Sequence, residues 1–545
     1  MVESCLMLRL STFSQGILGA LLFGVALVAG HAQENKLVVE LGGITFDSNY
    51  DNGSLGAMAM IADDRYQGSL FVESGELGER FYWFRFRMTG IAGRSFRMTL
   101  DHVENRRPFI RVGDTAWRRM TAAEASSSMQ LTLSFSEDEN DAEVAFFEPL
   151  GLAETYAAVN AISAGSPFFS AEVIGRSFLG NEVMMLKVED PRYPSVGKHR
   201  VWVHSRAHAG EVTSTHTMLG FLRQVLEDSE LGRQLREHCI FNIVPILNVD
   251  GVVAGHTRWD ARGLDPERPW CDVNIPSVQA VKDVVDELMT SATPIEVALN
   301  LHSTKGRYAD SFFFKHIAPS VTPAFEAIQQ RYIDAFDAAT PLFDNLSPQT
   351  SQLSECLFIE SYFWNNWGES VMAITHEGHY GQRVTDGAYL TGADYSEMGR
   401  AMAKALVSYF DLPRASEYDL DYATWVALNF TEEQQAAGTA TTHSADPDGD
   451  GVSNAEEFLV QTDPLSAASM LLPMQVQDGH IVINKAARIA DSAVEIHASK
   501  DLQSWSRIDV GLAETRVGAD GVERGVHSDP LGPDGQRFLR FQMVP

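Results

Sequence analysis

The sequence is short of basic residues. Its 545 residues include 42 lysines and arginines against 73 aspartates and glutamates, which gives a net charge of −31 at pH 7. Nucleic-acid phosphates and anionic lipid surfaces attract basic proteins, so this balance argues against both as partners. We interpret the charge as an acidic, solvated surface. With 45% hydrophobic and 10% aromatic residues the chain can still bury sizeable cores, and its length predicts about two to four domains.

Cysteine is also scarce, with only four in the chain, at Cys5, Cys239, Cys271 and Cys356. None has the Cys-x-x-Cys spacing, so a zinc site built from thiolates is not expected. Cys5 precedes the apolar run near the N-terminus and is expected to be removed with a signal peptide. At most one disulfide can therefore form among the other three, and the sequence leaves open which pair forms it and whether it forms.

No apolar run is long enough to cross a bilayer, which takes about 20 residues. The N-terminal run from Ile17 to Val28 is followed by Ala29-Gly30-His31-Ala32, small residues that suit cleavage before Gln33. We expect residues 1–32 to be a secretory signal peptide, with an uncleaved anchor as the alternative. The protein is therefore expected to be secreted or periplasmic, without a transmembrane segment.

Residues 33–155 have the pattern of β structure. Phe84, Phe86 and Met88 alternate with polar residues, and after the glycines at 90 and 93 the alternation resumes from Phe96. A period of two is typical of strands with one buried face. We expect a hairpin here, within an N-terminal antiparallel β-sandwich.

Residues 156–412 alternate between strand and helix patterns, which predicts an α/β domain with a mixed or parallel sheet. Strands are expected at 183–188, 201–203, 240–247, 295–301 and 371–375. Helices are expected near 212–228, 275–290, 322–339 and 393–410. Sites in such domains gather where strands end, and both His208 and His302 directly follow a strand.

Beyond residue 412 the character changes again. Residues 413–465 contain a polar stretch and an aspartate-rich segment, which indicates a linker. Residues 466–545 carry short alternating runs and predict a small C-terminal β domain.

His208 and Glu211 are three residues apart at a strand end, so both can face one metal ion. Catalytic zinc takes three protein ligands and keeps a position for water, and His302 is the best third ligand. Glu377 follows the strand at 371–375 and is placed to take a proton from water activated by the metal. We treat its neighbours His376 and His379 as bystanders, since His-Glu-x-His is one residue short of the His-Glu-x-x-His motif.

Several blocks in order resemble those of the zinc metallocarboxypeptidases, peptidase family M14, and most closely the cytosolic carboxypeptidase subfamily. The resemblance covers residues 40–412. The blocks are His208-Ala-Gly-Glu211, Asn248-Val-Asp-Gly251, Gly255-His-Thr-Arg258, Gly263-Leu-Asp-Pro-Glu-Arg268, Leu301-His-Ser303 and Thr375-His-Glu377, together with the β-sandwich opening at 46–55.

The resemblance implies a role for each matching residue. His208, Glu211 and His302 would hold the zinc, and Glu377 would be the general base and later the proton donor. Three further matches extend the site: Arg258 as the arginine that polarises the scissile carbonyl, Asp265 as the carboxylate that orients the first histidine, and Arg268 as the arginine that grips the terminal carboxylate.

Glu267 departs from the family, which carries an asparagine at this position. A carboxylate there should repel a substrate carboxylate unless it turns away or pairs with Arg268. We expect either an altered preference for the terminal group or weakened carboxypeptidase activity.

A second metal site is predicted in the linker, where residues follow a calcium-loop pattern with Gly451 at the sharp turn. An acidic linker without metal is the alternative. The predicted ligands are Asp446, Asp448, Asp450, the carbonyl of Val452, Asn454 and Glu457.

The sequence thus predicts a secreted zinc-dependent carboxypeptidase acting on the C-termini of peptides or proteins, with structural Ca²⁺ in its linker. One alternative is a zinc amidase or deacylase acting on cell-wall peptides or N-acyl amino acids. Another is a surface binding protein whose catalytic centre has decayed.

Overall fold

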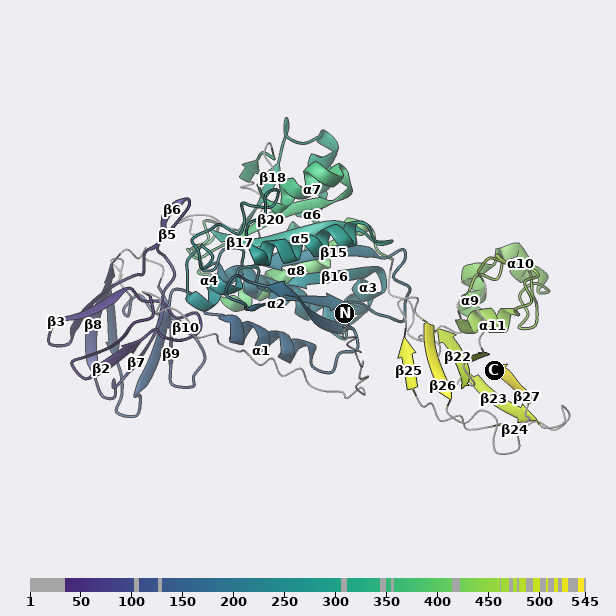
Figure 1. Cartoon of the computed structure of the whole chain (residues 1–545), viewed down its shortest axis with the longest axis horizontal. Coiled ribbons are helices and arrows are strands. Elements are labelled where there is room, and N and C mark those ends of the chain that lie inside the picture. Colours follow the sequence, from purple (N-terminus) through teal and green to yellow (C-terminus); the bar gives the residue numbers. More distant parts are fainter. Residues whose placement is uncertain are drawn as a thin grey trace, which may run out of the picture.

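The structure, a computed structural model, describes residues 35–543 apart from several segments. These gaps are residues 102–106, 126–129, 305–310, 344–348, 354–356, 414–421, 461, 470–473, 478–479, 487–493, 500–505, 508–513, 518–521 and 528–537. The predicted signal peptide lies outside the described residues. None of the helices in the described residues is long and apolar enough to span a membrane. Figure 1 shows N-terminal sheets, a central α/β domain and C-terminal strands in succession.

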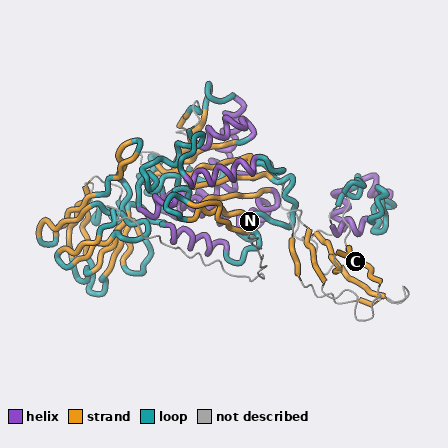
Figure 2. The backbone as a smooth tube through the Cα atoms, in the orientation of Figure 1, coloured by secondary structure: helices purple, strands orange, loops and turns teal. Residues whose placement is uncertain are grey.

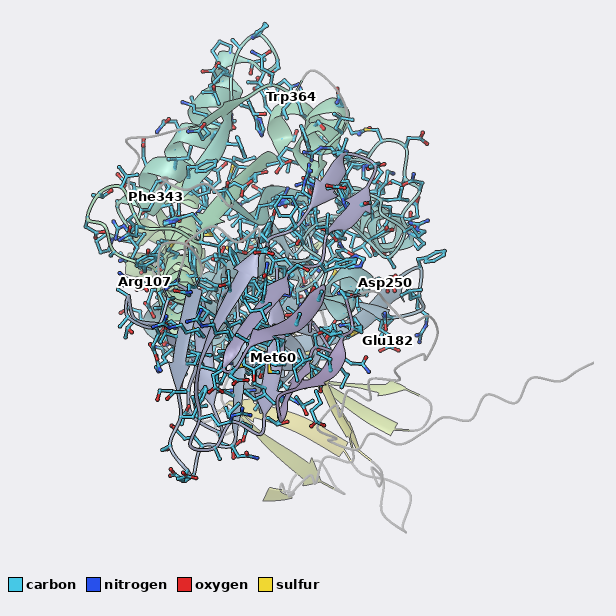
Figure 3. All side chains as sticks on the ribbon, turned by 90° about the vertical axis from the view of Figure 1, so that its left-hand side faces the viewer. Met60, Arg107, Glu182, Asp250, Phe343 and Trp364 are labelled. Atoms are coloured by element: carbon cyan, nitrogen blue, oxygen red, sulfur yellow. The ribbon has the colours of Figure 1, made fainter. Side chains whose placement is uncertain are left out.

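Two sheets of the N-terminal region pack face to face, beside the short hairpin of β5 (Glu73–Gly75) and β6 (Gly78–Arg80). One has the order β1-β2-β7-β12-β9-β10 and the other the order β11-β8-β4-β3. The strands of the first are β1 (Val38–Leu41), β2 (Ile44–Asp47), β7 (Arg85–Thr89), β12 (Asp141–Ala145), β9 (Phe109–Val112) and β10 (Arg118–Arg119). The strands of the second are β11 (Gln130–Ser134), β8 (Ser95–Asp101), β4 (Arg65–Ser69) and β3 (Ala57–Ala62). Figure 3 looks onto this region, with Met60 of β3 toward the viewer.

The hairpin predicted over residues 84–100 is wrong. β7 pairs with β2 and β12 in one sheet, whereas β8 pairs with β11 and β4 in the other. The connection through Gly90 and Gly93, both with positive φ, crosses from sheet to sheet, so the two apolar faces meet in the core instead of lying side by side. The sandwich is also not wholly antiparallel, because β4 and β8 run parallel.

The central domain is built on an eight-stranded mixed sheet with the order β13-β14-β16-β15-β17-β20-β18-β19. Its middle strands β16, β15, β17 and β20 are parallel neighbours, so their carboxyl ends meet at one edge. The strands are β13 (Phe169–Arg176), β14 (Glu182–Val188), β15 (His199–Ser205), β16 (Cys239–Val244), β17 (Ile295–Thr304), β18 (Phe312–His316), β19 (Gln349–Ser351) and β20 (Met372–His379). The predicted mixed-sheet α/β fold is confirmed.

Helices cover both faces of this sheet (Figure 2). Along β15, Val201 and Val203 join the core that includes α2 and α8, whereas Trp202 joins the core that includes α5 and α7. The helices of the domain are α1 (Leu152–Ser163), α2 (Val212–Leu226), α3 (Glu230–His238), α4 (Val249–Ala254), α5 (Pro276–Met289), α6 (Pro323–Asp337), α7 (Ile359–Trp367) and α8 (Gly392–Phe410), with a short 3₁₀ turn η1 (Gly368–Ser370). The predicted boundary at 155 lies within α1.

Helix starts follow the local sequence. Thr322 accepts a hydrogen bond from the backbone N–H of Phe325 and is followed by Pro323, which together begin α6. Thr391 and Asp394 form a reciprocal capping box at the start of α8. These signals explain why both helices could be placed from the sequence.

The segment predicted as a linker contains α9 (Tyr422–Asn429), α10 (Glu432–Ala437) and α11 (Asn454–Val460). Trp425, Phe430, Phe458 and Leu459 form a small apolar core between them. The described strands beyond it form two sheets, of β21 (Met474–Gln477), β22 (His480–Ala486), β26 (Val522–His527) and β25 (Glu514–Val517), and of β24 (Ser506–Arg507), β23 (Val494–Ser499) and β27 (Phe538–Met543).

Candidate metal centre and substrate pocket

The loop between β15 and α2 turns His208 and Glu211 into the protein. Arg206 is buried in a left-handed conformation with φ of 59°, and its Nε donates to the carbonyl of Ala209. Gly210 packs so closely on the next loop that a Cβ would lie 2.8 Å from the carbonyl oxygen of Thr257. A positive φ outside glycine is uncommon and often marks a functional turn. Here it folds the loop back on itself.

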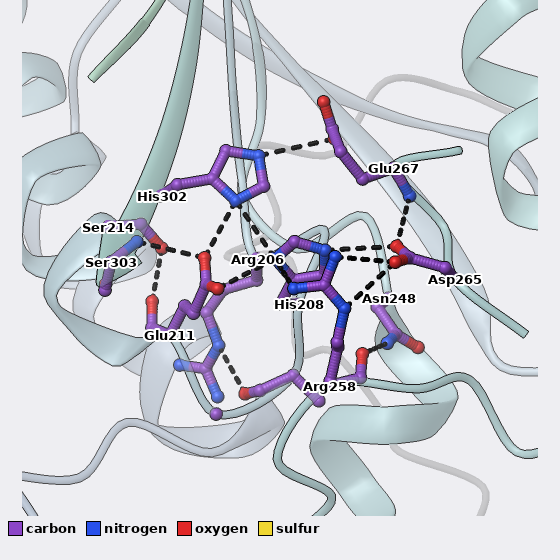
Figure 4. A network of polar contacts seen from close by, with 12 residues as sticks. Arg206, His208, Glu211, Ser214, Asn248, Arg258, Asp265, Glu267, His302 and Ser303 are labelled. Atoms are coloured by element: carbon purple, nitrogen blue, oxygen red, sulfur yellow. Dashed lines mark hydrogen bonds and ion pairs between the residues drawn. The ribbon is translucent and has the colours of Figure 1, made fainter. Parts of the chain in front are cut away.

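The three predicted ligands converge (Figure 4). Nδ1 of His208 lies 2.7 Å from Oε1 of Glu211, and Nδ1 of His302 lies 2.8 Å from Oε2 of the same carboxylate. The two Nδ1 atoms are 3.2 Å apart. Tetrahedral zinc with bonds of about 2.0–2.1 Å would set its ligand atoms about 3.3 Å apart. His208, Glu211 and His302 thus fit a metal ion.

Each histidine turns its other nitrogen toward a carboxylate. Nε2 of His208 lies 3.0 Å from Oδ1 of Asp265, and Nε2 of His302 lies 3.3 Å from Oε2 of Glu267. Histidines that bind metals usually donate their second N–H to such a partner, which leaves Nδ1 for the ion. Burial would raise the pKa of Asp265, but the hydrogen bond from His208 and its cationic neighbours hold it well below its usual range.

Glu377 lies beside this cluster at the end of β20. It faces His302 of β17 in parallel register, and one of its buried carboxylate oxygens has no hydrogen-bond partner among the described residues. Burial, and then the charge of Glu211, raise the pKa of Glu377. A carboxylate of this kind is suited to accept a proton.

The two histidines around Glu377 are not part of the described metal group. The His376 ring packs against Phe313 and Phe336 in the core, because neighbouring strand residues point to opposite faces. Burial lowers the pKa of His376 to about 3, so its ring is neutral. His379 donates its backbone N–H to the hydroxyl of Tyr395 and accepts from that hydroxyl at its carbonyl. The metal group contains His208, Glu211 and His302 only, within the described residues.

Arg258 lies next to the ligands. Its Nε and Nη2 both donate to Oδ2 of Asp265, at 2.9 and 2.6 Å, and its Nη1 is 3.5 Å from Nδ1 of His208. Asn248 caps α4 and donates its side-chain amide to the carbonyl of Arg258, which anchors the loop that carries it. The geometry places a fixed guanidinium beside the metal centre.

A cavity of about 570 Å³ opens in front of these residues. Arg268 lines it with its guanidinium 4.7 Å from the ring centre of Phe358. Within the described part of the chain this guanidinium makes no hydrogen bond or ion pair. It is therefore available to an anionic group that enters the cavity.

Glu267 turns away from Arg268. Its Oε2 faces His302, and its Oε1 accepts a hydrogen bond of 2.8 Å from the amide of Asn300. The Glu267 carboxylate therefore turns away from Arg268, one of the two possibilities raised by the sequence, and faces the predicted metal ligand His302. Its side chain still lines the cavity.

Several cavity residues were missed because no motif marks them. Tyr82 comes from the N-terminal sandwich, His316 from β18 and Glu360 from α7. Tyr362, the nearest tyrosine before Glu377, donates its hydroxyl to Asp286 and packs in the core. The apolar strand pattern that ends at His316 could have indicated this histidine. No pattern in the sequence marks Tyr82 or Glu360.

The N-terminal region also supports the arginine loop. The hairpin of β5 (Glu73–Gly75) and β6 (Gly78–Arg80) brings Glu73 to accept the backbone N–H of Arg258 at 2.5 Å. Thr257 accepts hydrogen bonds from the backbone N–H groups of Tyr82 and Trp83. The N-terminal region therefore holds the loop that carries Arg258 in place.

The calcium-loop residues also come together. Asp446, Asp448 and Asp450 have carboxylate oxygens within 4.8 Å of one another. Asp448, Asp450, Asn454 and Glu457 each keep one buried side-chain oxygen without a hydrogen-bond partner in the described structure. Burial, with the three aspartates adding to it, raises the pKa of Glu457 to about 7.

Two of the cysteines are described. Cys239 is a buried free thiol, and Cys271 is in a disulfide. The partner of Cys271 lies outside the described residues. One disulfide therefore forms, in line with the limit set by the sequence.

Residues 155–340 match the family model described as zinc carboxypeptidase, peptidase family M14. The chain therefore carries a domain of the zinc carboxypeptidase family, as the resemblance predicted. Among curated proteins, cytosolic carboxypeptidase 6 of Mus musculus is 22% identical over 292 residues, 48% of this chain and 53% of that protein. Cytosolic carboxypeptidase 6 of Caenorhabditis elegans is 24% identical over 293 residues, 48% of this chain and 63% of that protein. The chain thus spans about half the length of the curated relatives it matches.

Solved structures show the same fold over a longer stretch. A metallo-carboxypeptidase from Burkholderia cenocepacia superposes with a TM-score of 0.59 at 21% identity, covering 68% of this chain and 99% of that one. A metallo-carboxypeptidase from Pseudomonas aeruginosa gives 0.58 at 19% identity, covering 67% and 99%. The predicted fold class is confirmed by these neighbours.

Proposed function

We propose that this protein is a zinc-dependent metallocarboxypeptidase that removes C-terminal residues from peptides. The observation that carries the proposal is the convergence of His208, Glu211 and His302 beside an unpartnered carboxylate oxygen of Glu377 and an open cavity. The family of the domain supports the same chemistry.

The residues of the chain divide the work. Arg268 binds the terminal carboxylate of the peptide, and Arg258 donates to the oxygen that becomes negative as the carbonyl is attacked. Zinc held by the three ligands would polarise that carbonyl and lower the pKa of water at the site. Glu377 accepts a proton from water and passes it to the leaving amine. Asp265 and Glu267 hold the two histidines in the orientation that the ion requires.

A zinc amidase or deacylase would use the same ligands, and the two readings differ in what Arg268 binds. Its unpaired guanidinium in the cavity favours a substrate with a free carboxylate close to the scissile bond. The decayed binding protein is less well supported, because the ligands and the base occupy one assembled cluster.

The test uses the purified full chain. Bound zinc is measured by elemental analysis, and peptides with free or amidated C-termini are digested and followed by mass. We expect stoichiometric zinc, loss of single C-terminal residues from the free acids only, and inactivation by a chelator. Glu377→Gln should keep the zinc and lose about 10²- to 10⁴-fold in rate. Glu369→Gln, which removes an exposed carboxylate from the 3₁₀ turn η1 directly after α7, is the matched control. Cleavage of amidated peptides or of N-acyl groups would instead support the amidase, and a zinc-free, inactive protein would refute both enzymes.

We propose that the protein is exported. The apolar run and small residues before Gln33 support this, and so does the disulfide at Cys271, because such bonds persist in oxidising compartments. Expression with the native N-terminus in a bacterial host, followed by fractionation and N-terminal sequencing, is expected to give a periplasmic form that begins at Gln33. A full-length form in the cytosol would contradict this.

We also propose that Ca²⁺ binds the loop of residues 446–457. Asn454 and Glu457 are fully buried, yet each has an oxygen without a hydrogen-bond partner, which a hard cation would supply. The ion would join the aspartates to α11 and so to the small core around Trp425. Calorimetry with Ca²⁺ should show one site that Asp448→Asn with Asp450→Asn abolishes. Unchanged heat in this double variant would contradict the assignment.

A further inference from the structure

The short helix α4 ends against the N-terminal region of the chain. Figure 1 shows it on the side of the central domain that faces the N-terminal strands. The last backbone carbonyls of a helix find no partner within the helix itself. In α4 the backbone N–H groups that follow the helix occupy the carbonyls of Gly251 and Val252. The carbonyls of Val253 and Ala254 therefore need donors from elsewhere.

Residues from the start of the described chain supply these donors. The Lys36 ammonium donates to the carbonyl of Val253 at 3.1 Å, and the side-chain amide of Asn35 donates to the carbonyl of Ala254 at 2.5 Å. Asn52 adds its backbone N–H, which donates to the Val253 carbonyl at 3.2 Å. The end of α4 is thus bound by groups that come far earlier in the sequence.

Lys36 is the centre of this contact. Its ammonium group also donates to the carbonyls of Tyr50 and Gly53, both at 2.8 Å, so each of its three N–H bonds has a backbone acceptor. The carbonyl of Gly53 lies against Gly255, which ends α4 with a φ of 75°. A Cβ at Gly255 would be 2.2 Å from that oxygen. Lys36 therefore joins the two backbone segments that meet at Gly255.

Holding an ammonium group at this place is costly. Burial lowers the pKa of Lys36 to about 8, although the charge of Asp51 acts in the opposite direction. A lowered pKa means that the folded protein binds this proton less tightly than the unfolded chain does, so the charge opposes folding. A lysine at this position is therefore better explained by the backbone that it holds than by a gain in stability.

The segment that Lys36 holds leads directly to Arg258. This arginine follows Gly255 by three residues, and its carbonyl accepts a hydrogen bond of 3.1 Å from Asn248 at the start of α4. Its Nη1 lies 3.5 Å from Nδ1 of His208, beside the predicted zinc site. A displacement of about 1 Å in such a group can cost about 100-fold in rate. The position of α4 therefore matters for the placement of this guanidinium.

We propose that Lys36 is a positioning residue for Arg258, because it binds the backbone on both sides of Gly255 and so fixes where the loop of Arg258 leaves α4. This inference rests on the proposed carboxypeptidase function, in which Arg258 stabilises the charge that develops on the carbonyl oxygen. Within the described residues, Lys36 bonds neither a predicted zinc ligand nor Arg258 itself, so it acts through the backbone. Its loss should slow the chemical step and leave zinc binding and substrate binding unchanged.

The test compares Lys36→Met with wild type on a peptide that has a free C-terminus. We expect kcat to fall by about 5- to 50-fold, with KM and bound zinc within about twofold of wild type, because the affected interaction is made only in the transition state. Lys198→Met is the matched control and should keep kcat within about twofold. Burial lowers the pKa of Lys198 to about 8 as well, and its ammonium also donates to backbone carbonyls, those of Asp190 at 2.8 Å and Arg236 at 3.3 Å. It directly precedes β15, at the end opposite His208.

A double-variant cycle separates positioning from a general structural effect. If Lys36 acts through Arg258, Lys36→Met should cost less than about twofold in kcat when Arg258→Ala is already present. The full loss in that background, a loss of zinc, or a kcat within about twofold of wild type would each overturn the proposal. If Lys36→Met does not fold, Lys36→Gln is measured instead. This variant keeps an amide donor without the charge, and the same pattern is expected with a loss of about threefold or more.

Failure of this inference can be told apart from failure of the function. Unchanged kinetics in Lys36→Met refute the role of Lys36 and leave the carboxypeptidase intact. If the zinc-loaded wild type cleaves no peptide, the proposed function fails and hydrogen exchange decides. The backbone N–H groups of Gly255, His256 and Arg258 are all hydrogen-bonded. They should exchange about fivefold faster or more in Lys36→Met than in wild type or Lys198→Met, and equal exchange in the three proteins refutes the role.

Discussion

Asp265 contacts both a metal ligand and the arginine beside it, so replacing it with asparagine should affect two properties at once. Its Oδ1 lies 3.0 Å from Nε2 of His208, and its Oδ2 accepts both contacts from Arg258. The side chain is fully buried. An asparagine has one acceptor oxygen, so its NH₂ group must face either the imidazole or the guanidinium, both of which are donors here.

The expected magnitude follows from these contacts. Losing an outer partner of a ligating histidine typically weakens metal binding by about 10- to 100-fold, or about 1.4–2.8 kcal/mol. One hydrogen bond to a charged group is worth about 1.5–3 kcal/mol, which agrees with that range. We therefore expect Asp265→Asn to bind zinc about 10- to 100-fold more weakly. At saturating zinc it should still show reduced kcat/KM if the amide faces Arg258.

The assay is competition for zinc with a fluorescent chelator at pH 7.5, followed by kinetics with excess zinc. Asp260→Asn is the matched control. Asp260 is buried in the same loop and pairs with an arginine, at 2.9 and 3.1 Å to Arg262, but it touches no predicted ligand. If zinc affinity changes by less than threefold in Asp265→Asn, or by the same factor in both variants, the orienting role is refuted.

Two further predictions concern the loops around the centre. Burial raises the pKa of Glu73 to about 8, although the backbone hydrogen bonds that its carboxylate accepts act in the opposite direction. Its charged or titratable neighbours are Arg258 and His256. Its unfolded pKa is about 4.5, so between pH 4.5 and 8 the unfolded state releases a proton that the folded state keeps, and stability falls as pH rises. Glu73→Gln should therefore raise the melting temperature relative to wild type at pH 8 and not at pH 4.5. A difference in melting temperature between variant and wild type that stays constant from pH 4.5 to pH 8 would contradict this prediction. Gly210→Ala should destabilise the protein by about 1–3 kcal/mol and lower its zinc content, because the new methyl group would meet the Thr257 carbonyl at 2.8 Å. Chemical denaturation measures the first effect, and unchanged stability would show that the loop can move.

Much of the central domain could be predicted because its signals are local. The strand before His208 and the strand that carries His302 contain short apolar runs, and the caps of α6 and α8 are visible in the sequence. The pairing of β7 and β8 could not be predicted in this way. Alternation shows that a strand has one buried face, but a hairpin and a crossing between sheets bury that face equally well.

The same distinction applies to the site. The predicted metal ligands and Glu377 lie in or just after strands and within recognisable motifs, so the order of these motifs was enough to predict that they come together. Glu360 and Glu73 reach the centre from α7 and from the β5–β6 hairpin, where no spacing marks them. Only the packing of these elements against β17, β20 and the arginine loop brings their carboxylates into the site. The direction of Glu267 was likewise open, because a substitution in a motif does not show where the side chain turns.

The contacts between the N-terminal sandwich and the arginine loop divide the candidate site between two parts of the chain. Every predicted zinc ligand belongs to the central domain, whereas the loop of Arg258 is bonded to the N-terminal region. Glu73 accepts the backbone N–H of Arg258, and the hydroxyl of Thr257 accepts from the backbone N–H groups of Tyr82 and Trp83. A chimaera that takes its sandwich from a distant relative could therefore load metal normally and still misplace the arginine. Exchange of the N-terminal sandwich between related proteins should therefore succeed only if the few residues that form these contacts are exchanged together.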